Sequence, residues 1–180
     1  MNKIVKLALI LFAFSAVVAL LLGMVNVVTE GRIAALEKEK QDKAMQEVLP
    51  SSGYEELEYT GGNPNILNVF KAGDAGYVVK VVESGSQGNV EMIVGLDSSF
   101  TVTGVSIVKH QETSGLGAVA ASTGADGQAF RGQFVGLTNA SVTKDGGTVE
   151  AITSATITSR AVCGAVNAAR AKLQSFLAAK

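Results

Sequence analysis

The run from Leu7 to Val28 contains no charged residue and constrains this chain more than any other feature. As a helix it would rise about 33 Å, enough to cross a hydrocarbon core of about 30 Å. It is longer than the apolar region of a cleaved signal peptide, and no clear A-x-A cleavage site closes it. We therefore expect residues 1–29 to form an uncleaved transmembrane anchor, with a cleaved signal peptide as the alternative.

The residues on either side of this run are relevant to its orientation in the membrane. Lys3 and Lys6 precede it, and the basic residues that follow it alternate with acidic ones, so the count of basic residues does not settle the orientation. The amino-terminal flank is too short to carry a domain, and no cysteine follows the run to take a lipid. We expect a single-pass protein of the cell (inner) membrane with its main domain on the extracytoplasmic side.

Composition excludes several classes of site. With 15 basic and 16 acidic residues in 180, the chain lacks the charge pattern of a nucleic-acid-binding protein. Cys163 is the only cysteine and His110 the only histidine, so neither an internal disulfide, an iron-sulfur cluster nor a zinc site with two histidines is encoded. We expect no metal site and no catalytic acid-base pair, and any redox chemistry must come from an organic cofactor.

The remainder divides into a short helical segment and one domain. Residues 30–52 are rich in Glu, Lys, Ala and Gln up to Pro50, which predicts a helical stalk. In the domain, residues 53–180, three segments are rich in β-branched residues: Tyr77–Glu83, Val90–Leu96 and Phe100–Val108. Their links are too short for helical crossovers and predict antiparallel pairing. The third segment changes phase partway, which predicts a bulge at Gly104.

The carboxy-terminal stretch from Thr158 has helical periodicity. Its predicted apolar stripe consists of Val162, Ala165, Val166, Ala169, Leu173, Phe176 and Leu177. Cys163 lies beside this stripe and is expected to be a packed side chain rather than a redox partner. The fold class expected is α+β: an N-terminal transmembrane helix and helical stalk, then a largely antiparallel β-sheet domain with packed helices.

Five hydroxyl residues fall between Thr153 and Ser159, where this last helix begins. One or two of them would suffice to cap the helix. A helix start also attracts anions through its free N–H groups and partial positive charge. The residues alone leave both interpretations open, a capping cluster or an anion site.

The run EAITSATITSRAV, from Glu150 to Val162, resembles the flavinylation motif of FMN-binding domains. These domains occur in the Rnf electron-transfer complex and in the sodium-translocating NADH:quinone reductase. In that family, the last threonine of D-x-x-S/T-G-A-T carries FMN through a phosphoester bond. Glu150 replaces the Asp and Ser154 the Gly, whereas Thr153, Ala155 and Thr156 match. The serine puts the local backbone in question, because a glycine with positive φ is not readily replaced.

A second run, KHQETSGLG from Lys109 to Gly117, resembles the HxETPGLG loop of the same family, with Ser114 in place of Pro. Taken alone it would be a polar turn at the end of a strand. AFRGQFVG, from Ala129 to Gly136, is also similar to the family, so the resemblance covers most of the chain beyond the stalk.

The resemblance implies a set of cofactor-binding residues. Thr156 would bear FMN covalently as the phosphoryl threonine, and backbone donors from Gly115 to Gly117 and from the helix start would stabilise the phosphate. Lys109 and Arg160 are expected to be solvated surface charges. The candidate neighbours of the flavin are Thr153, Ser154, Ala155, Thr158, Ser159, His110, Glu112, Thr113, Gly115, Leu116 and Gly117.

The function implied is electron transfer through covalent FMN in an Rnf-type complex, between ferredoxin and NAD sites on other membrane subunits, coupled to sodium or proton movement. A separate magnesium-dependent flavin transferase would install the flavin from FAD. The short chain favours this complex over the equivalent subunit of the quinone reductase. Two further possibilities are a stand-alone extracytoplasmic flavin carrier and, from a different class, a non-redox membrane-anchored sensor or adaptor.

Overall fold

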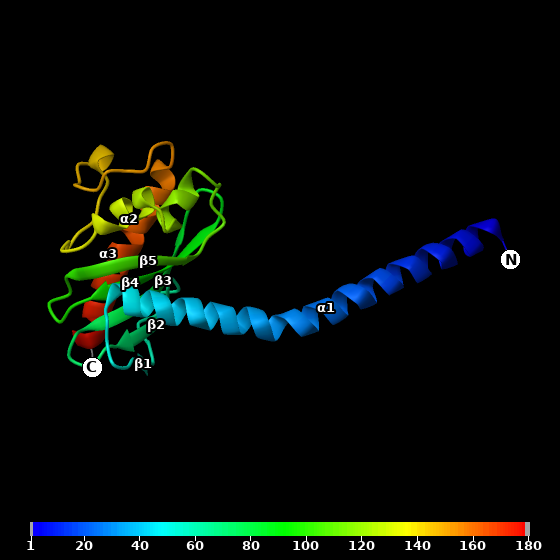
Figure 1. Cartoon of the computed structure of the whole chain (residues 1–180), viewed down its shortest axis with the longest axis horizontal. Coiled ribbons are helices and arrows are strands. Elements are labelled where there is room, and N and C mark those ends of the chain that lie inside the picture. Colours follow the sequence, from blue (N-terminus) through cyan, green and yellow to red (C-terminus); the bar gives the residue numbers. More distant parts are fainter. Residues whose placement is uncertain (1, 179–180) are drawn as a thin grey trace. The chain divides into compact units, whose positions relative to one another are not determined.

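The computed structural model describes residues 2–178, and the chain divides into two compact units, residues 1–40 and 41–180 (Figure 1). The helix α1, Lys3–Val48, covers most of the predicted anchor, residues 1–29, and most of the predicted stalk, residues 30–52. Its most apolar 18-residue window has a mean hydropathy of 2.8 and no buried residue, so α1 is long and apolar enough to cross a membrane. It ends before Pro50, as predicted, because proline disfavours helical conformation in the residue that precedes it.

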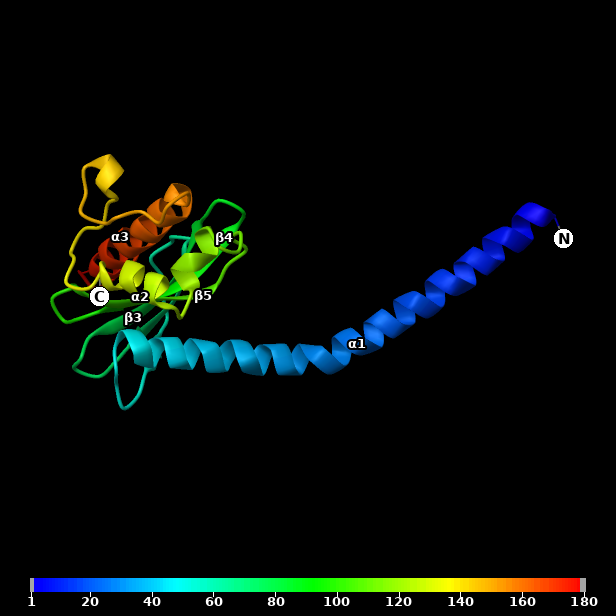
Figure 2. The same cartoon turned by 45° about the horizontal axis from the view of Figure 1, so that its top comes forward.

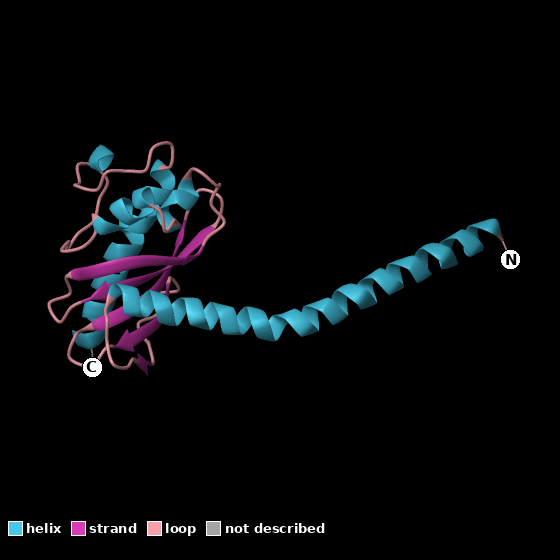
Figure 3. Ribbon diagram, viewed as in Figure 1, coloured by secondary structure: helices cyan, strands magenta, loops and turns pink. Residues whose placement is uncertain are grey.

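Five strands form one antiparallel sheet in which sequence neighbours are spatial neighbours (Figure 3). They are β1 (Glu55–Leu57), β2 (Ile66–Lys71), β3 (Tyr77–Ser84), β4 (Asn89–Leu96) and β5 (Val102–Lys109). The predicted antiparallel sheet is therefore confirmed, but β1 and β2 were not predicted. In β2 an irregular pairing between Ile66 and Asn68 breaks the alternation of buried and exposed residues.

The strand β5 differs from its prediction at two points. Gly95 pairs with Gly104 and Leu96 pairs with Val102, so the extra residue of the bulge is Thr103 rather than Gly104. The strand starts at Val102 instead of Phe100, because Phe100 has a φ of 61° in the preceding turn.

Helices cover both faces of the sheet (Figure 2). The long helix α3, Thr156–Ala178, buries the predicted apolar stripe against one face. The last turns of α1 pack on the other face, where Met45 and Val48 join Phe70, Val78 and Ile93 in a second cluster. The helix α3 begins at Thr156, two residues earlier than expected.

Three short helical segments connect β5 to α3, and none was predicted. They are η1 (Gly117–Ala121), α2 (Ala125–Gly132) and η2 (Thr143–Asp145). Figure 1 shows them grouped around the first half of α3. This arrangement brings the loop after β5 to the start of α3.

Candidate functional site

The two runs singled out in the sequence line the same cavity of about 280 Å³. One wall is the loop after β5, a second is the start of α3, and a third is the turn between β3 and β4. The lining residues are Ser86, Gln87, Glu112, Thr113, Leu116, Gly117, Ser154, Ala155, Thr156, Ile157 and Thr158. We call this space the threonine cavity.

The carboxylate of Glu112 joins the three walls. Its Oε2 accepts a hydrogen bond from Thr158 Oγ1 at 2.6 Å, and its Oε1 accepts from the backbone N–H groups of Ser86 and Gln87 at 2.8 and 3.2 Å. Burial raises the pKa of Glu112, but the bonds from Thr158 and from these N–H groups outweigh it and hold the pKa below its usual value. The buried side chain therefore stays ionised and fixes the two runs against each other.

Gly117 lets the loop approach α3 closely. A Cβ at this position would lie 2.6 Å from Thr158 Oγ1 and would overlap the Glu112 carboxylate. Beside this contact, the side chains of Leu116 and Ile157 remain 42% and 57% exposed. The threonine cavity thus has a tightly packed polar floor and two exposed apolar side chains at its edge.

The hydroxyl residues at the start of α3 have different roles. Ser159 is buried, and its Oγ accepts from Ile152 N–H and donates to Ala155 C=O, both at 3.0 Å. Thr158 is buried on Glu112, whereas Thr153 and Ser154 are exposed and Thr156 is half-buried. Of the five hydroxyls, that of Ser159 therefore holds the turn and that of Thr158 holds the loop after β5, whereas Thr156, the first residue of α3, does neither.

Ser154 has a φ of 61°, in the left-handed region. It occupies the position at which the resembled motif has glycine, so the serine keeps the backbone conformation that glycine favours. The next N–H group, that of Ala155, donates to Ile152 C=O at 2.9 Å and closes the turn. This turn leads directly into the first helical residue.

The segment η2 lies against the first two turns of α3. Lys144 Nζ donates to Thr156 Oγ1 at 3.2 Å. Arg160 donates to the Asp145 carboxylate through Nε at 2.7 Å and Nη2 at 2.6 Å. Arg160, expected to be a solvated charge, is therefore paired, and its hydrogen bond lowers the pKa of Asp145. No sequence pattern pointed to Lys144 or Asp145.

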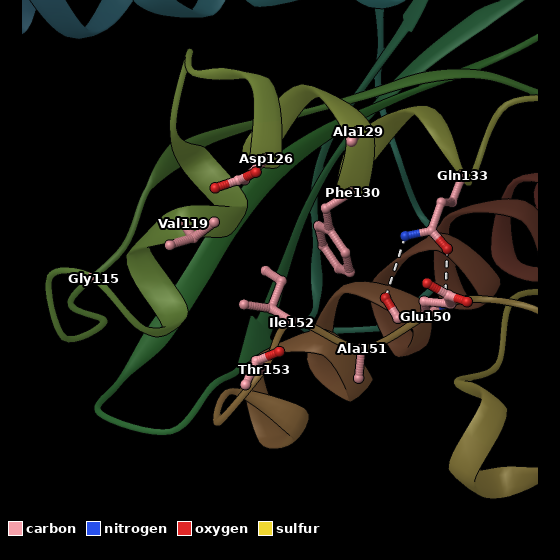
Figure 4. A pocket seen from close by; sticks show the side chains of 10 residues that line it. All are labelled: Gly115, Val119, Asp126, Ala129, Phe130, Gln133, Glu150, Ala151, Ile152 and Thr153. Atoms are coloured by element: carbon pink, nitrogen blue, oxygen red, sulfur yellow. Dashed lines mark hydrogen bonds between the residues drawn. The ribbon is translucent and has the colours of Figure 1, made fainter.

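The structure contains a second, larger cavity of about 710 Å³ (Figure 4). Gly115 and Thr153, which line it, are the chain neighbours of Leu116 and Ser154. Phe130 and Ile152 form apolar walls, with the carboxylate of Asp126 nearby (Figure 4). The remaining lining residues are Val119, Ala129, Gln133, Glu150 and Ala151.

Gln133 fixes the backbone at one end of this larger cavity. Its side-chain amide accepts from Glu150 N–H at 2.7 Å and donates to Glu150 C=O at 3.2 Å (Figure 4). The run from Ala129 to Gly136, similar to the family, therefore contributes to the site through α2 and this contact. Sequence reasoning had named the run but none of its residues as cofactor neighbours.

Some of the singled-out residues line neither cavity, among them Ser159, which is buried in the first turn of α3. His110 lines neither cavity; its Nδ1 accepts the N–H of Glu112 at 3.3 Å. Cys163 is buried in the core, and burial, with the charge of Asp145, raises its pKa to about 11, so the thiol stays protonated near neutral pH. Within residues 2–178, no group of three or more His, Cys, Asp or Glu side chains is placed to hold a metal ion.

Comparison with known sequences identifies the relatives of this chain. The sequence model of the FMN-binding domain family matches residues 85–171, which contain both runs, and that of the RnfG N-terminal region matches residues 1–48. The G subunit of the ion-translocating oxidoreductase complex of Methanosarcina acetivorans is 38% identical over 182 residues, 93% of each chain.

Two other relatives are similar over nearly their whole length. The G subunit of the Na⁺-translocating ferredoxin:NAD⁺ oxidoreductase complex of Acetobacterium woodii is 34% identical, over 90% of this chain and 87% of its own. The corresponding subunit of Pseudoalteromonas atlantica is 31% identical, over 91% and 85%. The chain therefore belongs to the family of G subunits of ion-translocating oxidoreductase complexes and contains that family's FMN-binding domain.

Proposed function

We propose that this chain is the electron-transfer subunit of an Rnf-type ferredoxin:NAD oxidoreductase complex and carries FMN through a phosphoester bond to Thr156. The observation that carries the proposal is the meeting of both family-like runs around the half-buried Thr156 hydroxyl. The relatives are named as subunits of such complexes, one of them translocating Na⁺. Other subunits of the complex are accordingly the expected partners.

The residues present fit a phosphate-linked flavin. The N–H groups of the first turn of α3 have no partner within the helix, and a helix start favours an anionic phosphate. A phosphoester on Thr156 would lie at that start. The larger cavity, about 710 Å³, is within the range of small-ligand sites and provides space for the ring beside Phe130 and Ile152.

When bound, FMN supplies one-electron and two-electron transfer, and the chain binds and orients it. Glu112 and Gly117 keep the loop after β5 against α3, which fixes the shape of the site around the attachment point. Asp126 and Glu150 line the larger cavity. Negative charge at these positions disfavours additional negative charge on a bound ring, so these residues tune its potential downward.

The remaining parts of the proposal concern location and maturation. Residues 1–29 would cross the cell membrane, residues 30–52 would form the stalk, and residues 53–180 would be the FMN domain on the extracytoplasmic side. A covalent link prevents loss of the flavin where no cytoplasmic pool can replace it. A flavin transferase that uses FAD would install it on Thr156.

Coexpression with a flavin transferase tests the attachment. Intact mass and flavin fluorescence in a denaturing gel should show an FMN-sized gain on the wild type and on Thr148→Val, and none on Thr156→Val. The Thr148 variant is a matched control, since Thr148 is an exposed threonine that lines neither cavity. Absence of flavin on the wild type would favour a non-redox adaptor. Loss of all copurifying membrane subunits from a flavinylated protein would favour a stand-alone carrier.

A further inference from the structure

The contact between Lys144 and Thr156 is not used by the proposed function. We propose that Lys144 is the cation that promotes phosphoester formation at Thr156 and neutralises the product, and that the Asp145–Arg160 ion pair positions it. This inference rests on the proposed attachment of FMN to Thr156. Lys144 Nζ lies 3.2 Å from the oxygen that would form the ester.

The loop that carries Lys144 has a defined shape. Val142 and Val149 are both buried and pair as an isolated parallel bridge. The N–H groups of Thr143, Gly147 and Val149 donate to Val149, Val142 and Ser141 carbonyls at 2.9, 3.0 and 3.0 Å, respectively. These bonds close residues 141–149 into a compact loop, so Lys144 is presented by a structured backbone.

The ion pair fixes this loop onto α3. Asp145 follows Lys144 directly and receives both hydrogen bonds of the Arg160 fork at 2.7 and 2.6 Å. Arg160 is four residues after Thr156 and therefore lies on the same face of the helix. A bidentate pair restricts direction as well as distance. With Asp145 held there, the adjacent Lys144 side chain reaches Thr156.

The chemistry at Thr156 is favoured by such a cation. In the transfer, Thr156 Oγ1 forms a bond to the phosphorus of the FMN half of FAD, the pyrophosphate bond breaks and AMP leaves. The hydroxyl proton passes to a base of the transferase. Negative charge develops on Oγ1 as its proton leaves and then departs with AMP, whereas the phosphodiester keeps the single charge that its phosphate carried in FAD. An ammonium group already placed at Oγ1 stabilises both states.

If Lys144 were only a solvated surface lysine, Asp145 would affect the transfer through its charge and not by positioning Lys144. The variant Asp145→Asn distinguishes these two roles. Asp145→Asn removes a negative charge near the acceptor while leaving Lys144 and Arg160 charged. If Asp145 acted through its charge alone, this variant would raise the positive potential at Thr156 and speed up transfer. If Asp145 positions the loop, the variant frees Lys144 and slows transfer. The sign of the change therefore identifies the role.

The experiment uses the full chain in detergent with purified flavin transferase, FAD and Mg²⁺, and measures the initial rate of FMN incorporation by intact mass and in-gel fluorescence. Lys144→Gln should lower kcat about tenfold at saturating acceptor protein. This is less than the roughly 10²–10³-fold loss for one buried oxyanion donor, because the site is partly screened by solvent. Lys144→Arg should restore most of the rate. Lys172→Gln is the matched control, because Lys172 is an exposed lysine of α3 about 24 Å along the helix.

Asp145→Asn should slow transfer severalfold, and should have no further effect in the Lys144→Gln background, since coupled residues are not additive. Thermal unfolding of the unmodified proteins should be unchanged by Lys144→Gln. A wild-type kcat for Lys144→Gln, an effect confined to KM, or faster transfer with Asp145→Asn would overturn the inference. Failure of the wild type to accept FMN would instead contradict the attachment to Thr156 and remove the basis of both proposals.

Discussion

At the scale of single residues, Ser154 shows how a departure from a motif can leave the backbone unchanged. A serine in the left-handed region costs about 1 kcal/mol relative to glycine, and this cost is partly offset because serine restricts the unfolded chain. We therefore expect Ser154→Gly to stabilise the protein by up to about 1 kcal/mol and Ser154→Val to destabilise it by more than that.

Thermal unfolding of the full-length variants measures this difference. Ser99→Gly is the control, because Ser99 is exposed and its φ is not positive. Glycine at position 99 only increases the conformational entropy of the unfolded chain and should lower stability by about 0.5–1 kcal/mol. Equal destabilisation by glycine at both positions would contradict the strain assigned to Ser154.

The contribution of Glu112 to the stability of the protein should depend on pH. Its pKa is lowered from 4.5 in the folded protein, so its stabilisation is complete above that value and is lost as the pH falls through the lower, folded-state pKa. Glu112→Gln should cost about 1–2 kcal/mol near pH 7, because an amide replaces the charged acceptor of three hydrogen bonds. Below pH 4.5 the difference from the wild type should shrink.

Denaturant unfolding of the full-length protein between pH 7 and pH 3 checks this prediction. Glu58→Gln serves as the control, since Glu58 is an exposed glutamate in the same domain. It should leave both the stability and its pH dependence nearly unchanged. A constant gap between Glu112→Gln and the wild type over the whole range would argue against an ionised, hydrogen-bonded Glu112.

At the scale of elements, two paired glycines allow the end of α1 to lie directly on the sheet. A Cβ at Gly104 would be 2.8 Å from Val48 Cα, and one at Gly95 would be 2.6 Å from the Val48 carbonyl oxygen. Thr103, the extra residue of the bulge, donates to that carbonyl at 2.7 Å. The glycine pair and the bulge together create the docking position for the last turn of α1.

Gly104→Ala should therefore destabilise the protein by about 1–3 kcal/mol, because the added methyl group meets backbone that cannot yield easily. Gly132→Ala, in α2 where an added Cβ meets nothing within 4 Å, should be neutral or stabilising by up to about 1 kcal/mol. Thermal unfolding of both full-length variants tests the contrast. Similar effects of the two substitutions would contradict the close approach of Val48.

The sequence predicted those elements whose pattern is local. Alternating β-branched residues marked β3, β4 and most of β5, and the apolar spacing marked α3. The strand β2 was missed because its bulge interrupts the alternation, and α2 was missed because its eight residues bury only Gly127, Phe130 and Arg131. Arg131 is buried on the carbonyls of Ala120 and Ser122, an arrangement that polar patterning does not reveal.

At the scale of the whole molecule, the sequence identified the two runs that meet at the site but not the contacts that hold them. Glu112 was named as a neighbour of the flavin, whereas the structure shows it bonded to Thr158, 46 residues away. Lys144 carried no signal, since its contact with Thr156 depends on how residues 141–149 close. Motifs thus located the chemistry, and long-range hydrogen bonds determined its geometry.

The central claim is that one threonine of this chain carries the flavin. Trypsin cleavage after Lys144 and Arg160 would release residues 145–160, a peptide that contains Thr148, Thr153, Ser154, Thr156, Thr158 and Ser159. Tandem mass spectrometry of this peptide, from protein matured with a flavin transferase, should place the FMN-phosphoryl group on Thr156. Its location on any other hydroxyl, or an unmodified peptide from fluorescent protein, would contradict the account.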